Sequence, residues 1–95
     1  MSTATIFDQI ALKIIKSQEM IIGPVAIEQA RRVPHLVVDW ETKEITINGN
    51  EAHAIDALVE VYKELFGQIS VEVSKEAAAS LLGQLPADSL PEALK

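Results

Sequence analysis

Residues 36–50 read LVVDWETKEITINGN and carry the clearest strand pattern in the chain. Leu36, Val38 and Trp40 alternate with mostly polar neighbours, and after a short polar link the same pattern resumes at Ile45. Alternation with a period of two indicates a strand with one buried face, and two such runs predict an antiparallel hairpin. Because Trp40 is in phase with Leu36 and Val38, we expect its large ring to anchor the buried face.

Helical patterns flank this hairpin on both sides. Before it, apolar residues at helical spacing predict a helix over residues 5–19, and a shorter helix over residues 24–32 follows a Gly-Pro break. After it, an apolar stripe predicts a helix over residues 51–66, with Asn50 as its N-cap and Gly67 as its stop. The hairpin is therefore expected to lie between two pairs of helices.

The residues after Gly67 have two interpretations. Residues 69–73 alternate apolar and polar side chains, which is typical of a strand, whereas the following residues up to Leu82 favour a helix. We expect a helix from Ser70 or Ser74 to Leu82 and keep a short third strand over residues 69–73 as the alternative. The predicted fold class is α+β: helix, short helix, antiparallel β-hairpin, helix, helix, with the helices packed on one face of a small sheet.

The length of 95 residues fits one domain with one modest core. Residues 1–85 are predicted to form a single compact α+β domain. Residues 86–95 contain two prolines and little periodicity, which predicts a flexible C-terminal tail.

Composition and charge favour some classes of function over others. The formal net charge is −6, and a surface of that sign repels nucleic acid and anionic lipid, so binding to either is not expected. The chain has no cysteine and no apolar run near the roughly 20 residues of a membrane-spanning helix. These features predict a small acidic cytoplasmic protein.

Reactive side chains form no recognised catalytic or metal-binding motif. The two histidines, His35 and His53, lie near Asp39 in the sequence, but their spacing matches no zinc-ligand pattern. No serine stands in a nucleophile elbow, and four glycines provide no phosphate-binding loop. We therefore expect no enzymatic activity, no metal and no cofactor. A small-ligand or metal-binding protein with a pocket around these three residues remains an alternative.

Arg31 and Arg32 are adjacent and end the predicted second helix. Two helices ending in a basic pair suggest, as another alternative, a small DNA-binding transcriptional regulator that uses the first two helices. The acidic total charge disfavours this, because DNA-binding proteins usually carry a basic stripe. Positive charge at a helix C-terminus is explained equally well by the helix dipole.

Apolar residues are more numerous than a 95-residue domain with a two-stranded sheet is expected to bury, since 48% of the chain is hydrophobic. The favoured hypothesis is therefore a non-enzymatic protein–protein interaction or regulatory module whose partner is another protein or, most simply, a second copy in a homodimer. The predicted interaction patch consists of Phe7, Ile10, Ile14, Ile21 and Ile22.

Overall fold

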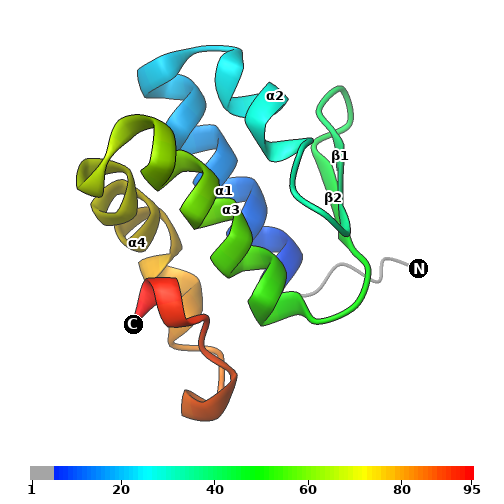
Figure 1. Ribbon diagram of the computed structural model, residues 1–95. Coiled ribbons are helices and arrows are strands. Elements are labelled where there is room, and N and C mark those ends of the chain that lie inside the picture. The colour runs from blue at the N-terminus through cyan, green and yellow to red at the C-terminus, as the bar shows by residue number, and fades with distance from the viewer. Residues whose placement is uncertain (1–5) are drawn as a thin grey trace.

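The computed structural model describes residues 6–95 and has the predicted α+β architecture (Figure 1). A helical layer packs against one face of a two-stranded antiparallel sheet. No helix within residues 6–95 combines the length and the apolarity needed to cross a bilayer. The elements, in chain order, are α1 (Ile6–Ile22), α2 (Val25–Ala30), β1 (Leu36–Asp39), β2 (Glu44–Ile47), α3 (Glu51–Phe66), α4 (Gln68–Leu82) and the 3-10 helices η1 (Ala87–Ser89) and η2 (Glu92–Leu94).

Helix α1 extends three residues beyond its predicted end at Glu19, while its predicted start at Thr5 lies outside the described residues. The helix continues through Ile22 because no helix-breaking residue precedes Gly23. Gly23 has a φ of +77°, and its N–H donates to the carbonyl of Glu19 at 2.8 Å. Glycine adopts this left-handed conformation without steric cost, which ends the helix and starts the turn into α2.

The hairpin has the predicted orientation. Leu36 pairs with Ile47 and Val38 pairs with Ile45, so the apolar residues of both strands share one face. Leu36 and Ile45 are buried, and β2 packs against α1. Trp40 lies just beyond β1 and is only partly buried, packing against the edge of the core.

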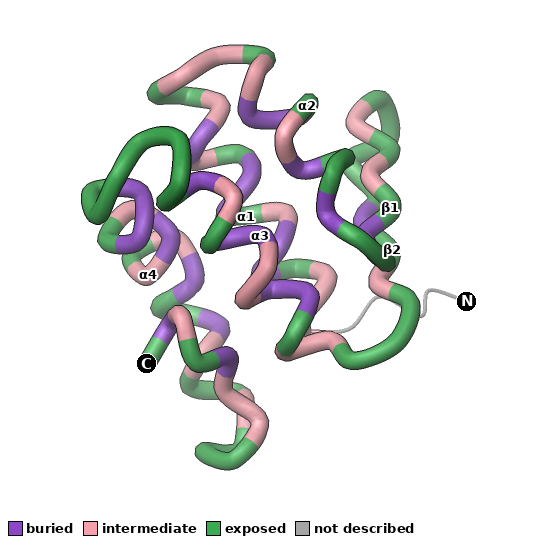
Figure 2. The backbone as a smooth tube through the Cα atoms, viewed as in Figure 1, coloured by how far each residue is buried: buried purple, intermediate pink, exposed green. Residues whose placement is uncertain are grey.

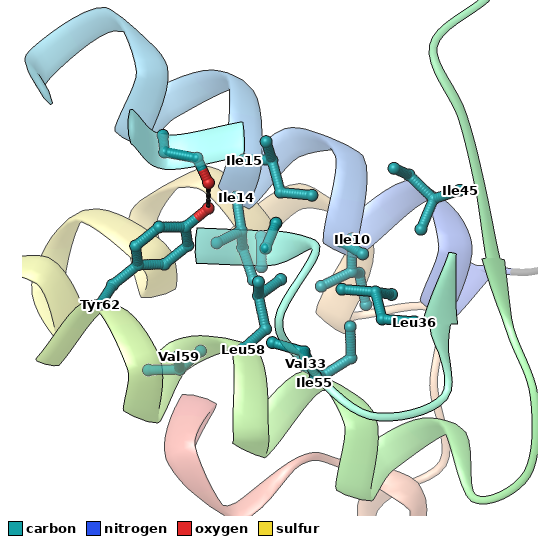
Figure 3. Close-up of a cluster of buried hydrophobic side chains, with 14 of the residues drawn as sticks. Ile10, Ile14, Ile15, Val33, Leu36, Ile45, Ile55, Leu58, Val59 and Tyr62 are labelled. Carbon is teal, nitrogen blue, oxygen red and sulfur yellow. Dashed lines mark hydrogen bonds between the residues drawn. The ribbon is translucent and has the colours of Figure 1, made fainter. Parts of the chain in front are cut away.

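The core lies between the four α-helices and the hairpin, and its buried side chains are aliphatic apart from Tyr62 (Figure 3). Helix α3 has the predicted bounds, and the side chain of Asn50 caps it by accepting a hydrogen bond from the backbone N–H of His53 at 2.9 Å. Helices α1 and α3 run in the same direction, so their C-terminal ends lie at the same end of the molecule (Figure 1). The largest buried aliphatic side chains are Ile10, Ile14, Ile15, Ile55 and Leu58.

Residues 69–73 are helical, so the third-strand alternative is wrong and α4 begins earlier than either predicted start. The buried face of α4 consists of Ser70, Val71, Ser74, Ala78 and Leu81, which recur at helical spacing.

The C-terminal segment, predicted to be a flexible tail, packs against α3 and α4 in the structure. Pro91 and Leu94 are buried, and the backbone N–H of Ala93 donates to a carboxylate oxygen of Asp56 at 2.8 Å. The burial of two apolar side chains and one hydrogen bond to α3 hold this segment against the helices.

Candidate functional site

Five large apolar side chains are exposed where three helices meet. They belong to the last turns of α1 and α3 and to the first turn of α4. Their exposed fractions range from 36% at Phe66 to 88% at Met20, although apolar residues of this size usually contribute to a core. We call this surface the apolar corner: Met20, Ile21, Leu65, Phe66 and Ile69.

The connection between α3 and α4 creates much of this surface. Gly67, with a φ of +80°, is the single residue between the two helices, and its N–H donates to the carbonyl of Lys63 at 2.8 Å. A connection this short turns the chain sharply, so that residues 63–69 are all exposed in one unbroken stretch (Figure 2). Three of the five corner residues belong to this stretch.

A buried polar bridge places the end of α1 against the start of α4. The side-chain amide of Gln18 donates to the carbonyl oxygen of Ser70 at 3.2 Å and to the hydroxyl of Ser74 at 3.3 Å. The Ser74 hydroxyl in turn donates to the Ser70 carbonyl at 2.8 Å. Gln18 is 2% exposed and Ser74 is completely buried. This bridge fixes how the two helices pack at the corner.

The same bridge indicates that Ile21 of α1 and Ile69 of α4 are neighbours. The two helices run in opposite directions (Figure 1), and Gln18 lies opposite Ser70. Ile21 follows Gln18 by three residues, and Ile69 immediately precedes Ser70. Both therefore lie beyond the bridge, toward the same end of the helix pair.

A second buried hydrogen bond ties α3 to α2 at this end of the molecule. The hydroxyl of Tyr62 donates to the carbonyl oxygen of Ala26 at 2.7 Å (Figure 3). Burial raises the pKa of this hydroxyl well above that of an exposed tyrosine. Tyr62 therefore remains a neutral donor and holds the last turns of α3, to which Leu65 and Phe66 belong.

Charged residues of both signs adjoin the part of the apolar corner that α3 and α4 form. Lys63, Glu64 and Glu72 are all exposed on the same two helices. Within residues 6–95, neither Lys63 nor Glu64 is part of an ion pair. The surface thus has an apolar centre and a rim with unpaired positive and negative charge.

The predicted interaction patch is divided by the fold. Ile10 and Ile14 are fully buried in the core and have no surface that a partner could contact. Phe7 and Ile22 are partly buried against the core, and Ile21, at 63% exposed, belongs to the apolar corner. The five predicted residues therefore do not form one surface, and only Ile21 belongs to the corner.

Four corner residues were absent from the predicted patch. Leu65 and Phe66 complete the apolar stripe of α3, and such a stripe does not show where the neighbouring elements that cover it end. The local signal for them is Gly67: a helix that stops in a one-residue turn leaves its last turn uncovered.

The two histidines lie together in the structure, apart from Asp39. His35 and His53 line one cavity, between the start of β1 and the first turns of α3. Asp39 is the last residue of β1, and its carboxylate accepts a hydrogen bond from the backbone N–H of Thr42 in the hairpin turn at 3.3 Å. Residues 6–95 contain no cluster of three or more histidine, cysteine or carboxylate side chains that could hold a metal ion.

The remaining predicted residues are on other surfaces. Arg31 forms the C-cap of the six-residue helix α2, and both Arg31 and Arg32 are exposed. The indole N–H of Trp40 donates to a carboxylate oxygen of Glu19 at 3.3 Å, and the Lys43 ammonium lies 4.3 Å from the centre of the ring. Trp40 is therefore occupied by contacts within the chain.

Comparisons with protein-family models, with curated proteins and with solved structures found no match to this chain.

Proposed function

We propose that this protein is a non-enzymatic interaction or regulatory module that associates with a second copy of itself through the apolar corner. The observation that carries the proposal is the contrast between Gln18, buried at 2% exposure, and the large apolar side chains exposed beside it. Each large apolar side chain left in water forgoes about 1.5–3 kcal/mol that full burial would provide. Folding alone gives no reason for this arrangement, whereas an interface does.

Charge supports a second copy as the partner. A two-fold axis through the corner places the same patch opposite itself, so the rim must complement itself. Lys63 and Glu64 provide both signs within two adjacent residues, and neither is paired within residues 6–95. A lysine of one copy can therefore meet a glutamate of the other. Nucleic acid and anionic membranes require a basic cluster, which this rim lacks.

The composition of the corner also fits an interface. Interface centres are enriched in aromatic residues and methionine and depleted in lysine and glutamate, which are more common at the rim. Phe66 and Met20 belong to the apolar corner, and Lys63, Glu64 and Glu72 are exposed on the helices that supply its α3 and α4 residues. The absence of cysteine from the chain further supports a cytoplasmic location, where thiols remain reduced.

Sedimentation equilibrium of the full chain and two charge variants tests this proposal. Ile69→Glu places a carboxylate in the proposed interface, where burial without a partner is unfavourable. Val37→Glu is the matched control, because Val37 is 52% exposed on the hairpin, away from the corner. We expect a reversible monomer–dimer equilibrium for the wild type and for Val37→Glu. Ile69→Glu should raise the dissociation constant at least about a hundredfold.

Two results would contradict the proposal. One is a wild-type chain that stays monomeric up to the highest concentration at which it remains in solution. The other is an equal effect of both substitutions, because added negative charge alone would then explain the loss. Circular dichroism of the variants identifies any that do not fold.

A further inference from the structure

The cavity that contains both histidines lies far from the apolar corner. It has a volume of about 310 Å³, near the lower limit of the roughly 300–1,000 Å³ typical of small-molecule sites. His53 and Phe66 are at opposite ends of α3 and, at 1.5 Å per residue, about 20 Å apart along the helix axis. The lining residues are Pro34, His35, Gly49, Asn50, His53, Ala54 and Ala57.

Small side chains on one face of α3 leave this space open. Positions 50, 53, 54 and 57 follow helical spacing, so they share one face of the helix, and two of them are alanines. The opposite wall is the segment before β1, held by a hydrogen bond from the Asn48 N–H to the His35 carbonyl at 2.8 Å. The cavity is thus formed by secondary structure and a fixed loop.

His35 has a backbone conformation that is unusual for a residue with a side chain. Its φ is +68°, in the left-handed region, which costs a non-glycine residue roughly 1–2 kcal/mol. Strained residues of this kind tend to cluster at functional sites, although histidine tolerates the left-handed region better than most residues do. The strain is therefore found at one of the two histidines that line the cavity.

The lining offers hydrogen bonds without formal charge. It contains no lysine, arginine, aspartate or glutamate. A neutral imidazole has one donor and one acceptor nitrogen, so the two histidines provide both kinds of group. The carbonyl oxygen of the Asn50 side chain already accepts a hydrogen bond from the backbone N–H of His53. The NH₂ group of the same side chain is therefore left as a further donor. Pro34, Ala54 and Ala57 supply apolar walls.

We propose that this cavity binds a small, neutral heteroaromatic molecule of one or two rings that carries both hydrogen-bond donors and acceptors. A flat ring suits apolar walls, and ring nitrogens or amino groups can pair with the imidazoles and the Asn50 amide. An anion would find no lysine or arginine in the lining and a chain of net charge −6 around it. A cation would find no carboxylate in the lining.

Titration of the ¹⁵N-labelled full chain with adenine, followed by amide NMR spectra, tests this inference. Indole is the comparison probe, because it has a similar bicyclic shape but one donor and no ring acceptor. We expect adenine to shift the amide signals of Gly49, His53 and Ala57 in a saturable manner. Indole should bind at least about fivefold more weakly, since hydrogen bonds to the lining are lost.

Two variants locate the binding. Ala57→Leu fills the cavity and should abolish the saturable shifts, while Ala79→Leu, the same change at an exposed position of α4, should leave them unchanged. His53→Gln changes an exposed side chain while keeping the backbone N–H that Asn50 caps, and it should weaken adenine binding about five- to tenfold. Absence of saturable shifts, equal affinity for indole, or shifts that persist in Ala57→Leu would each overturn the inference.

Discussion

The two ends of the helical layer differ in the polar side chains that they bury and in the apolar side chains that they expose. At the end next to the hairpin, Ile10, Ile55 and Leu36 are buried, as expected for apolar residues in a folded domain. At the other end, Gln18 is buried with two serines, while Ile69 and its apolar neighbours are exposed. The same helices, α1 and α3, contribute to both ends.

This difference separates residues that fold the chain from residues that are available for another purpose. Exposed single apolar residues are common, but an exposed group of them beside a buried polar bridge is informative. The hairpin end is explained by the hydrophobic effect within one chain. The hydrophobic effect within residues 6–95 does not account for the apolar corner, and we propose that a second copy of the chain covers it.

The largest effect is expected at the hairpin end. Ile55→Ala removes a fully buried side chain and leaves a cavity, so it should lower the free energy of unfolding by about 2–5 kcal/mol. Ile69→Ala, the same change at the corner, should cost less than about 1 kcal/mol because Ile69 is 68% exposed. Urea denaturation at protein concentrations low enough to keep the chain monomeric measures both. Equal losses would remove the distinction between the two ends.

An intermediate effect is expected at the polar bridge. Gln18→Ala removes the amide that joins α1 to Ser70 and Ser74 and should destabilise the chain by about 1–3 kcal/mol. Gln9→Ala is the matched control, since Gln9 is exposed on the same helix and should change stability by less than about 0.5 kcal/mol. A similar small change at both positions would mean that the bridge does not determine how α1 and α4 pack.

A smaller effect, with a distinctive pH dependence, is expected at Tyr62. Tyr62→Phe loses the hydrogen bond to the Ala26 carbonyl and should cost about 1 kcal/mol. Because burial raises the pKa of this hydroxyl, the folded chain keeps the proton above pH ~10, where the unfolded chain releases it. Tyr62 therefore stabilises the fold fully below that pH and less as the pH rises.

The stability of Tyr62→Phe should lack this pH dependence, because phenylalanine has no proton to release. Urea denaturation of both chains at neutral pH and above pH ~10 gives the comparison. The difference in stability between wild type and Tyr62→Phe should shrink as the pH rises. A constant difference would show that Tyr62 titrates alike in the folded and unfolded states.

The smallest effect on monomer stability is expected at Met20, which is 88% exposed. Met20→Ser should change the free energy of unfolding of the monomer by less than about 0.5 kcal/mol. The same substitution should nevertheless weaken self-association about tenfold or more, because it removes apolar area from the proposed interface. For this one variant, urea denaturation measures the stability of the monomer, and sedimentation equilibrium measures self-association. A large loss of monomer stability would place Met20 in the core.

Elements with local boundary signals could be predicted from the sequence. The bounds of α3 follow from Asn50 and Gly67, which adjoin its ends and act through their own backbone and side-chain geometry. The hairpin follows from alternation within a dozen residues. In both cases the deciding interactions join residues that are close in the sequence.

Burial that depends on distant partners could not be predicted in this way. Ser70 and Ser74 are buried because Gln18, more than fifty residues earlier, supplies a hydrogen-bond partner. Local sequence alone, which does not show that partner, favours Ile69 for a buried face and makes residues 69–73 resemble a strand. Ile10 and Ile14 entered the predicted patch for a related reason: helical spacing shows that residues share a face, but not which neighbour covers it.

The central claim is that the apolar corner is covered by a second copy of the chain. A soluble paramagnetic agent, which broadens the NMR signals of solvent-exposed methyl groups, tests it directly at concentrations above and below the dissociation constant. We predict that dilution increases the broadening at Met20, Ile21, Leu65 and Ile69 and leaves Val37, the exposed control on the hairpin, unchanged. Corner methyl groups that are equally accessible at both concentrations would contradict the account.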